Sequence, residues 1–310
     1  MDATLRGHPG QGQGIEKLPR VWERFKGGTV SAGATPEVVA EGPAWVHIDA
    51  RKCWGPVAGA YAMDAAIGKA KSAGIGLATV RRSNHYGTSG YYAMRAASAG
   101  MIGLAMTNAG PEMAPWGGIT PLLGTNPWGI AIPREPFPLV LDMALTQSGK
   151  GMLRWAKAHG LPIPPNWAYA PDGSETVDHD LALLGPLVPV GEFKGTGLSL
   201  MTDILTGVMS GSAFGTGAYA DPAEHDAGHT MLAIDYTRFI SPGDFTFRLD
   251  ELVSEIKSSE LRHGFDEILL PGELEHRRMV KRKRDGVPIE ATTVSELQAL
   301  CKELRISCPL

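Results

Sequence analysis

One histidine of the chain lies in a setting suited to proton transfer. His85 follows Ser83 and Asn84 in the run RRSNHYG, directly after a short apolar segment. An imidazole exchanges a proton near neutral pH, and the amide or hydroxyl beside it could orient the ring or cap a following helix. Arg81 and Arg82 suit a carboxylate, because a guanidinium binds it through two hydrogen bonds. The run indicates acid–base chemistry on a small acid; the alternative is a helix cap with an incidental histidine.

A second candidate is a lysine in a glycine-rich turn. Residues 191–197 read GEFKGTG and precede an apolar helical segment, with Lys194 and Gly195 at the centre of the turn. Free amide groups at the start of a helix, together with a lysine, suit a phosphate or pyrophosphate. Close packing of the helix against a neighbouring backbone is the alternative, and it explains the glycines but not the lysine.

The familiar nucleotide-binding motifs are missing. No G-x-G-x-x-G turn follows the apolar runs that end at Val80 and Thr107, and the GQGQG of residues 10–14 has no apolar strand before it. Residues 148–151, SGKG, lack the upstream glycine and the final Ser or Thr of a P-loop. A nucleotide would therefore bind by another route.

No metal site is predicted. His225 and His229 have the spacing of a helical metal pair, but Gly228 between them favours a loop that leads into a strand. Cys53, Cys301 and Cys308 show no paired spacing, which excludes a disulfide framework and a four-cysteine zinc site.

Helical and strand-like apolar patterns alternate along most of the chain. The first pair is a helix over residues 54–73, ended by Gly74, and a strand over 75–80. Further helices are expected over 87–100, 148–159, 194–209, 249–261, 273–284 and 294–304. Further strands are expected over 102–107, 130–132, 139–142, 231–236 and 267–270. The alternation predicts an α/β fold in which His85 and Lys194 lie at junctions between elements.

The overall composition narrows the class of protein. The 310 residues include 29 basic and 33 acidic side chains, a net charge of −4, which is too little positive charge for a nucleic-acid binder. The first twenty residues hold no apolar segment like that of a secretory signal, and no window reaches the ~18 apolar residues of a membrane span. We expect a globular cytoplasmic protein of one or two domains, with no nucleic-acid or membrane partner.

Several segments, in their order and spacing, resemble those of a known family: RSNHYG, TNPWG, LVLDMAL, GEFKGTGLSL and LPGE. The family is the type 2 malate/L-lactate dehydrogenase family, which also includes sulfolactate, ureidoglycolate and 2,3-diketogulonate dehydrogenases and is unrelated to the Rossmann lactate dehydrogenases. The resemblance implies a family-specific, non-Rossmann NAD(P)-binding fold with a mixed sheet, and a homodimer. It also implies a cofactor domain over residues 85–240, inserted between the parts 1–84 and 241–310 of a domain for substrate binding and dimerisation.

The resemblance also assigns site residues. His85 is the candidate proton donor or acceptor, and we expect Asn84 or Ser83 to fix its ring. Lys17, Arg6 or Arg82 would hold the substrate carboxylate. The residues expected to bind NAD or NADP are Ser89, Gly124, Thr125, Asn126, Asp142, Met143, Ala144, Leu145, Lys194, Gly195, Gly272 and Glu273.

The N-terminal stretch departs from the family pattern. Relatives often carry Ser-His-Gly followed closely by an arginine, whereas the aligned residues 10–17 read GQGQGIEK. A glutamine replaces the histidine, which is the assigned acid or base in some relatives, and Lys17 replaces the arginine. Glutamine cannot donate a proton at neutral pH, and the candidate to take its place is His8, the nearest histidine. The chain also begins at Met1, close to this stretch, so weakened activity is one expectation.

These observations predict an oxidoreductase that moves a hydride between NAD or NADP and C2 of a small 2-hydroxy or 2-oxo acid, such as malate or lactate. His85 would protonate the alkoxide as it forms. Two alternatives stay open. One is a reductase of cyclic 2-imino acids, and the other is a catalytically weakened homologue that binds the cofactor without turnover.

Overall fold

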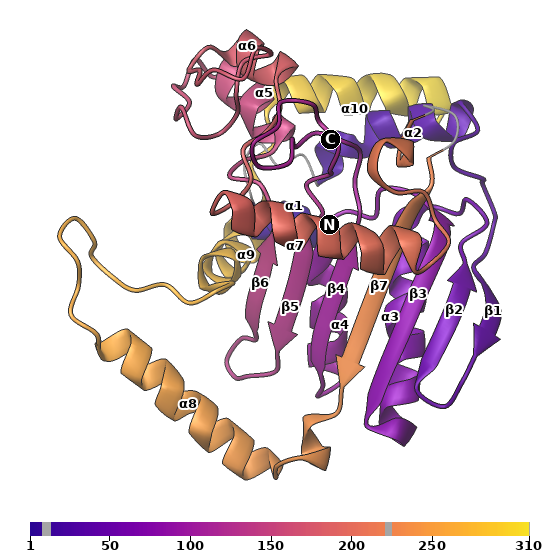
Figure 1. Cartoon of the computed structure of the whole chain (residues 1–310), viewed down its shortest axis with the longest axis vertical. Helices are drawn as coiled ribbons and strands as arrows, with labels where there is room; N and C mark the ends of the chain where they lie inside the picture. Colours follow the sequence, from indigo (N-terminus) through magenta and orange to yellow (C-terminus); the bar gives the residue numbers. More distant parts are fainter. Residues whose placement is uncertain (8–13, 221–224, 310) are drawn as a thin grey trace.

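A seven-stranded mixed sheet forms the centre of the molecule in the computed structural model, which describes residues 1–7, 14–220 and 225–309 (Figure 1). The strands are β1 (Glu37–Glu41), β2 (Trp45–Asp49), β3 (Ile75–Ser83), β4 (Ile102–Thr107), β5 (Trp128–Ile132), β6 (Leu139–Met143) and β7 (Ala227–Ile234). Their order in the sheet is β1-β2-β3-β7-β4-β5-β6. Only β2 and β3 run parallel; the other neighbouring pairs are antiparallel. The expected α/β class and mixed sheet are confirmed.

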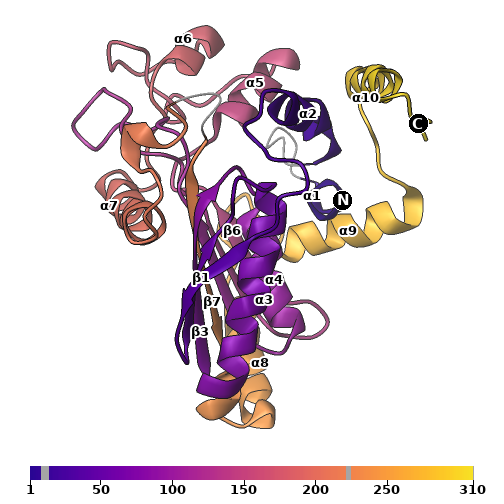
Figure 2. The same ribbon diagram turned by 90° about the vertical axis from the view of Figure 1, so that its right-hand side faces the viewer.

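Helices surround this sheet unevenly. The α-helices are α1 (Asp2–Arg6), α2 (Leu18–Lys26), α3 (Gly55–Ala73), α4 (Ser89–Ser98), α5 (Lys150–Ala158), α6 (His179–Leu184), α7 (Phe193–Asp203), α8 (Pro242–Ser258), α9 (Glu273–Asp285) and α10 (Ala291–Leu304). Short turns of other helix types are η1 (Ile15–Lys17), η2 (Ile204–Val208), η3 (Gly215–Gly217) and η4 (Tyr236–Arg238). Helices α3 and α4 cover one face of the sheet, and α7 crosses one end of the opposite face (Figure 2).

The main core lies between α3, α4 and the sheet. It is built largely from alanines of α3 and from the inward residues of the central strands, among them Ile48, Val80 and Met231, all fully buried. Small residues let the backbones approach closely: a Cβ at Gly76 of β3 would lie 1.9 Å from the Ala66 oxygen of α3. The helix and strand that the sequence predicts at residues 54–80 are therefore joined by backbone contact as well as by side chains.

A smaller apolar cluster holds α5 and α6 together above the end of the sheet. Its buried members are Leu153, Ala156, Ile163, Ala168, Ala182 and Leu187. The C-terminal helix α10 fixes α2 nearby, because Glu303 accepts hydrogen bonds from the Trp22 indole at 2.8 Å and from Lys26 at 3.0 Å. The middle and the end of α2 are thus anchored by the far end of the chain.

One predicted strand is wrong. Residues 267–270 form no strand, because their backbone groups are taken by side chains: Ile268 O accepts from Lys257 Nζ at 2.6 Å, and Leu270 N donates to Glu273 at 3.0 Å. Most other predicted elements are present with shifted ends. The helix expected over 249–261 runs from Pro242 to Ser258, and the one over 194–209 becomes α7 followed by a π-helical turn.

The sheet bears on the expected domain division. Strands β2 and β3 lie within residues 1–84, β4 to β7 lie within 85–240, and β7 pairs with both β3 and β4. The proposed boundary therefore passes through one continuous sheet, and the division stays a prediction. Across the described ranges, none of the helices is both long and apolar enough to cross a membrane.

Candidate active site

The peptide before His85 is held rigidly at the end of β3. The Asn84 side chain is 1% exposed; its oxygen accepts from Gly55 N and its nitrogen donates to Cys53 O, both at 2.8 Å. Gly55 opens α3 directly against this peptide, since a Cβ there would lie 2.4 Å from Asn84 O and 2.5 Å from His85 O. The first turn of α3 therefore fixes where the His85 backbone sits.

The ring of His85 is oriented by groups other than those expected. Nδ1 accepts the Gly87 N–H at 3.1 Å, and Nε2 lies 3.2 Å from Lys17 Nζ. Asn84 bonds Gly55 and Cys53 instead, so the prediction that Asn84 or Ser83 fixes the ring is wrong. The structure does bring together His85 and Lys17, which are 68 residues apart in the chain.

Ser83 belongs to a buried network beneath the site. Its Oγ shares a hydrogen bond of 2.8 Å with His229 Nε2, and His229 Nδ1 bonds Thr107 Oγ1 at 2.7 Å. Tyr86 stacks on the His229 ring with centroids 4.5 Å apart. Burial lowers the pKa of His229 to about 3, so the imidazole is neutral. Its two hydrogen bonds link β7 to β3 and β4.

The electrostatic setting disfavours positive charge on both Lys17 and His85. Burial, with the charges of Arg24 and Arg20, lowers the pKa of Lys17 to about 8. Burial and the charges of Lys17 and Arg24 hold the pKa of His85 well below its usual value. A carboxylate faces them as well: burial raises the pKa of Glu112, against the charges of Lys150, Arg154 and Lys17.

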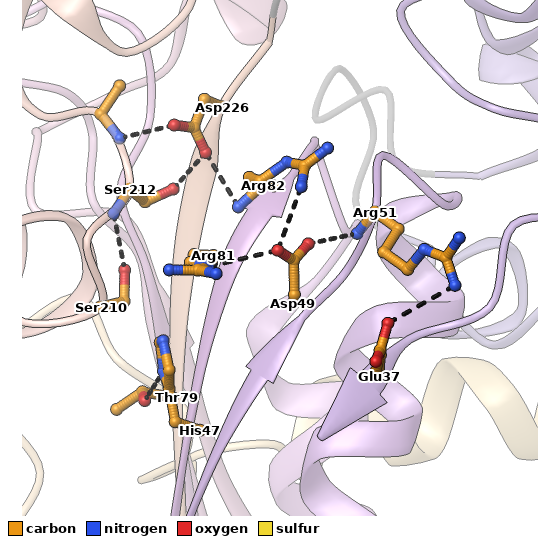
Figure 3. Close-up of polar contacts among 11 residues, drawn as sticks. Glu37, His47, Asp49, Arg51, Thr79, Arg81, Arg82, Ser210, Ser212 and Asp226 are labelled. Carbon is orange, nitrogen blue, oxygen red and sulfur yellow. Dashed lines mark hydrogen bonds and ion pairs between the residues drawn. The ribbon is translucent and has the colours of Figure 1, made fainter. Parts of the chain in front are cut away.

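The side chain of Arg82 is engaged in an ion pair at the end of β3. The Arg82 guanidinium lies 3.1 Å from the Asp49 carboxylate, which also pairs with Arg81 at 3.3 Å. The backbone N–H of Arg82 donates to Asp226 at 2.9 Å (Figure 3). Burial acts to raise the pKa of Asp49, but the Arg51 backbone N–H and these two arginines outweigh it and lower that pKa. Arg82 is thus committed to an ion-pair cluster rather than turned toward Lys17 and His85.

Arg6 lies in a different place, on the wall of a cavity of about 400 Å³. The cavity is also lined by Asp142, Gly272, Tyr91 and Val140. Although the Asp142 carboxyl is open to the cavity, burial by the surrounding protein raises its pKa to about 6. Hydrogen bonds from the backbone N–H groups of Gly90 and Ser89 act in the opposite direction and offset only part of this rise. Two predicted cofactor residues and one predicted substrate residue therefore line one hollow of the size typical of ligand sites.

Several other predicted cofactor residues cluster just beyond the end of β6. Asn126 Nδ2 donates to Ser199 O at 2.9 Å, Leu145 N donates to Thr125 O at 2.8 Å, and a Cβ at Gly195 would lie 2.9 Å from Leu145 O. Gly124 belongs to the same cluster, because its carbonyl accepts from Ser199 Oγ at 3.0 Å.

The end of β6 links this turn cluster to the cavity. Met143 and Ala144, both half-buried, connect Asp142 with Leu145. Ser89 is buried at the start of α4, where its Oγ shares a 2.6 Å hydrogen bond with Tyr86. Lys194 is exposed at the start of α7. A carboxylate, a cation and a tight glycine turn around one strand end provide the mixed polar set that an extended dinucleotide needs, so these residues fit the expected cofactor.

The Glu273 carboxylate forms hydrogen bonds and ion pairs with other residues of the protein. Burial acts to raise its pKa, but the Leu270 N–H, Lys257 and Arg277 together lower that pKa to about 2. The carboxylate receives Lys257 and Arg277 at 2.5 Å each, so it ties the loop before α9 to α8. Gly272 precedes it with φ of 82°, and a Cβ there would lie 2.9 Å from that of Val140.

The two histidines with metal-like spacing are separate in space. His229 lies inside β7, and His225 lies outside any helix with its ring 4.5 Å from that of Tyr219. Among the residues that the structure describes, no three His, Cys, Asp or Glu side chains form a group that could hold a metal. The glutamines of residues 10–13 and the candidate His8 lie outside the described residues.

Sequence reasoning missed Arg24 and Glu112, whose charges act directly on Lys17. Arg24 lies seven residues after Lys17, about two helical turns on, so helical spacing could have placed it on the same side of α2. No local pattern points to Glu112, which reaches the site from the loop after β4.

The sequence and the fold are similar to those of characterised dehydrogenases. The model of the malate/L-lactate dehydrogenase family matches residues 1–298. L-sulfolactate dehydrogenase of Methanothermobacter thermautotrophicus is 35% identical over 310 residues, covering 99% of this chain and 89% of that protein. The (2R)-3-sulfolactate dehydrogenase (NADP(+)) of Chromohalobacter salexigens is 34% identical over 292 residues, covering 92% and 84%.

Solved structures of dehydrogenases and a reductase have a similar fold. Malate dehydrogenase of Pyrococcus horikoshii superposes with a TM-score of 0.90 at 35% identity, covering 99% of this chain and 86% of that one. Δ1-piperideine-2-carboxylate reductase of Pseudomonas syringae gives 0.84 at 28% identity, covering 96% and 89%. With a family model that spans nearly the whole sequence and relatives that match it end to end, this chain belongs to the malate/L-lactate dehydrogenase family.

Proposed function

We propose that the protein is an NAD(P)-dependent 2-hydroxy acid dehydrogenase of the EC 1.1.1 type, acting on malate, lactate or a similar small acid. The observation that carries this proposal is the Lys17–His85 pair, 3.2 Å apart, in a chain of this family that also has a cavity lined by predicted cofactor residues. A bound nicotinamide, as NAD or NADP, supplies or accepts the hydride at C2 of the substrate.

The chain's own residues have the remaining work of binding, orienting and moving a proton. We assign proton exchange with the substrate oxygen to the Lys17–His85 pair. The substrate carboxylate needs a cation, and Arg24 is better placed for it than Arg82, which is paired with Asp49, or Arg6, which is paired with Asp2. Asp142, the turn around Asn126 and the start of α7 would hold the cofactor.

The test is a set of direct assays. Oxaloacetate, pyruvate and a sulfonated 2-oxo acid are each supplied with NADH and with NADPH, and loss of absorbance at the reduced nicotinamide band is followed. Cofactor binding is measured separately by quenching of tryptophan fluorescence. Turnover of at least one 2-oxo acid supports the proposal. Binding of both cofactors with no turnover of any 2-oxo acid contradicts it and favours the homologue that only binds.

A second candidate is a reductase of cyclic 2-imino acids. It is favoured by the structural likeness to Δ1-piperideine-2-carboxylate reductase. The same assays run side by side with a cyclic 2-imino acid separate the two activities, since kcat/KM should differ by at least tenfold in favour of the true substrate class.

We also propose that two copies associate through the sheet face opposite α3 and α4. Strand register aligns one apolar residue from each of six strands there: Trp45, Leu77, Leu232, Leu104, Ile130 and Leu141. The end members are 44% and 36% exposed, and the others are half-buried. A contiguous apolar row of this kind is typical of an interface between subunits.

The oligomeric state is tested by sedimentation velocity. The apparent mass of the wild-type protein should be twice that of one chain, and the apparent mass of the Leu104→Glu variant should be that of one chain. A wild-type monomer would contradict the dimer. The division into domains and the cytoplasmic location stay predictions.

A further inference from the structure

The contacts of His85 decide which member of the pair can carry a proton to the substrate. A neutral imidazole has one nitrogen with a lone pair and one with a hydrogen. The Gly87 N–H donates to Nδ1 at 3.1 Å, so Nδ1 carries the lone pair and Nε2 carries the hydrogen. The Nε2–H then points at Lys17 Nζ, 3.2 Å away.

This tautomer suits a neutral amine at Lys17. An amine accepts the Nε2–H through its lone pair, whereas an ammonium has only donors to offer and is opposed by that hydrogen. Protonating the ring does not resolve the conflict, because a hydrogen on Nδ1 would then face the Gly87 N–H. The ring therefore holds Nζ in position and destabilises its charged form.

From this geometry we infer that Lys17, rather than His85, is the group that exchanges a proton with the substrate oxygen, and that His85 is its positioning residue. The inference rests on the proposed dehydrogenase function. When C2 of a 2-oxo acid accepts a hydride, the C2–H bond forms and the carbonyl π pair moves to oxygen. The Lys17 ammonium donates its proton to that oxygen and becomes an amine, which solvent reprotonates.

On balance, burial and the charged groups around the pair also disfavour the Lys17 ammonium. Arg20 and Arg24 of α2 disfavour the Lys17 ammonium, while Glu16 of η1 and Glu112 of the loop after β4 partly offset them. His85 faces Arg24 as well, and His229 from β7 below it. With burial, they bring the pKa of Lys17 to about 8, near the operating pH at which a general acid works best.

Lys17 stands where relatives often carry an arginine, so the substitution Lys17→Arg is a sharp test of this inference. If Lys17 only holds the substrate carboxylate, Lys17→Arg should keep or improve activity, because a guanidinium binds a carboxylate with two hydrogen bonds. If Lys17 moves the proton, an arginine cannot replace it, because a guanidinium does not lose its proton. Proton donors of this kind contribute roughly 10²–10⁴-fold to rate.

We therefore expect Lys17→Arg to lower kcat at least 100-fold with KM changed less than about fivefold, and to remove the ionisation near pH 8 from the kcat profile. His85→Asn should move that ionisation upward by at least one pH unit. Lys26→Arg is the matched control, because Lys26 is an exposed lysine at the far end of α2, the helix that Lys17 precedes, and it should leave kcat unchanged. Retained kcat in Lys17→Arg would overturn the inference.

Two measurements on the protein without cofactor separate this inference from the proposed function. Competitive acetylation with acetic anhydride, read by peptide mass spectrometry, should give Lys17 a reactivity midpoint near pH 8, well below that of Lys26, whose pKa is raised by its hydrogen bonds to Glu23 and Glu303. Nitrogen-15 NMR should show His85 as the Nε2–H tautomer. A Lys17 midpoint above 10, or an Nδ1–H tautomer, overturns the inference. If both results are as expected but no substrate is turned over, the pair stands and the dehydrogenase proposal fails.

Discussion

Asn84→Ala should destabilise the protein and impair the site together. The substitution removes both 2.8 Å hydrogen bonds that join the end of β3 to Gly55 N and Cys53 O, and it leaves these two buried groups without those bonds. An unsatisfied buried donor or acceptor costs about 1–3 kcal/mol, so the two groups together predict a loss of roughly 2–6 kcal/mol in the free energy of unfolding. This is a large part of the roughly 5–15 kcal/mol that a folded protein has.

The free energy of unfolding is measured by urea titration followed by circular dichroism. Ser72→Ala is the control, because its Oγ bonds only Lys69 O near the exposed end of α3, and it should change stability by less than about 0.5 kcal/mol. The loosened peptide should also displace His85, so kcat/KM should fall about tenfold or more under conditions in which the variant stays folded. A variant that unfolds within about 1 kcal/mol of wild type and keeps its kcat/KM would refute the anchoring role.

Three further outcomes follow from the contacts described. Gly90→Ala would place a Cβ 2.9 Å from Asp142 Oδ2, so the Kd for NADH or NADPH from fluorescence titration should rise at least tenfold, and an unchanged Kd would count against the cavity as the cofactor site. His229→Asn should flatten the acid dependence of stability: the native pKa of about 3 lies below the usual 6.5, so the wild type loses about 1.4 kcal/mol per pH unit as pH falls below about 6.5, and equal slopes in the two proteins would contradict this. Glu273→Gln should cost about 1–3 kcal/mol at pH 7 in urea unfolding, with the difference from wild type shrinking as pH falls from about 4.5 toward about 2, because the native carboxylate has the lower pKa; a constant difference would refute the ion-pair explanation.

Elements with local apolar patterns could be predicted from the sequence. Residues 102–107 form β4 with the expected bounds, and α3 begins one residue after the expected position, because apolar spacing and Gly74 mark these elements directly. The strand β1 gave no such signal, since all five residues of Glu37–Glu41 are exposed at the sheet edge. The segment 267–270 is apolar in part, yet no neighbouring strand pairs with it, and side chains take its backbone groups.

The site was predictable in its members more than in their contacts. His85 and Lys17 were both identified, but a contact across 68 residues depends on α2 being fixed by α10, which no local pattern contains. The short polar side chains beside His85 were expected to serve its ring. They bond to other groups because Ser83 points to the buried His229 and Asn84 points to the start of α3.

The position of β7 has a consequence for how the chain is completed during synthesis. β7 is the last strand in the sequence but the middle one of the sheet, and Ser83 and His229, which share a hydrogen bond across it, are 146 residues apart. Until Ala227–Ile234 leaves the ribosome, β1–β3 and β4–β6 are two separate three-stranded halves, each with an open inner edge. Such edges invite pairing with other nascent chains, so a transcript truncated before Ala227 should yield aggregates rather than a smaller folded protein.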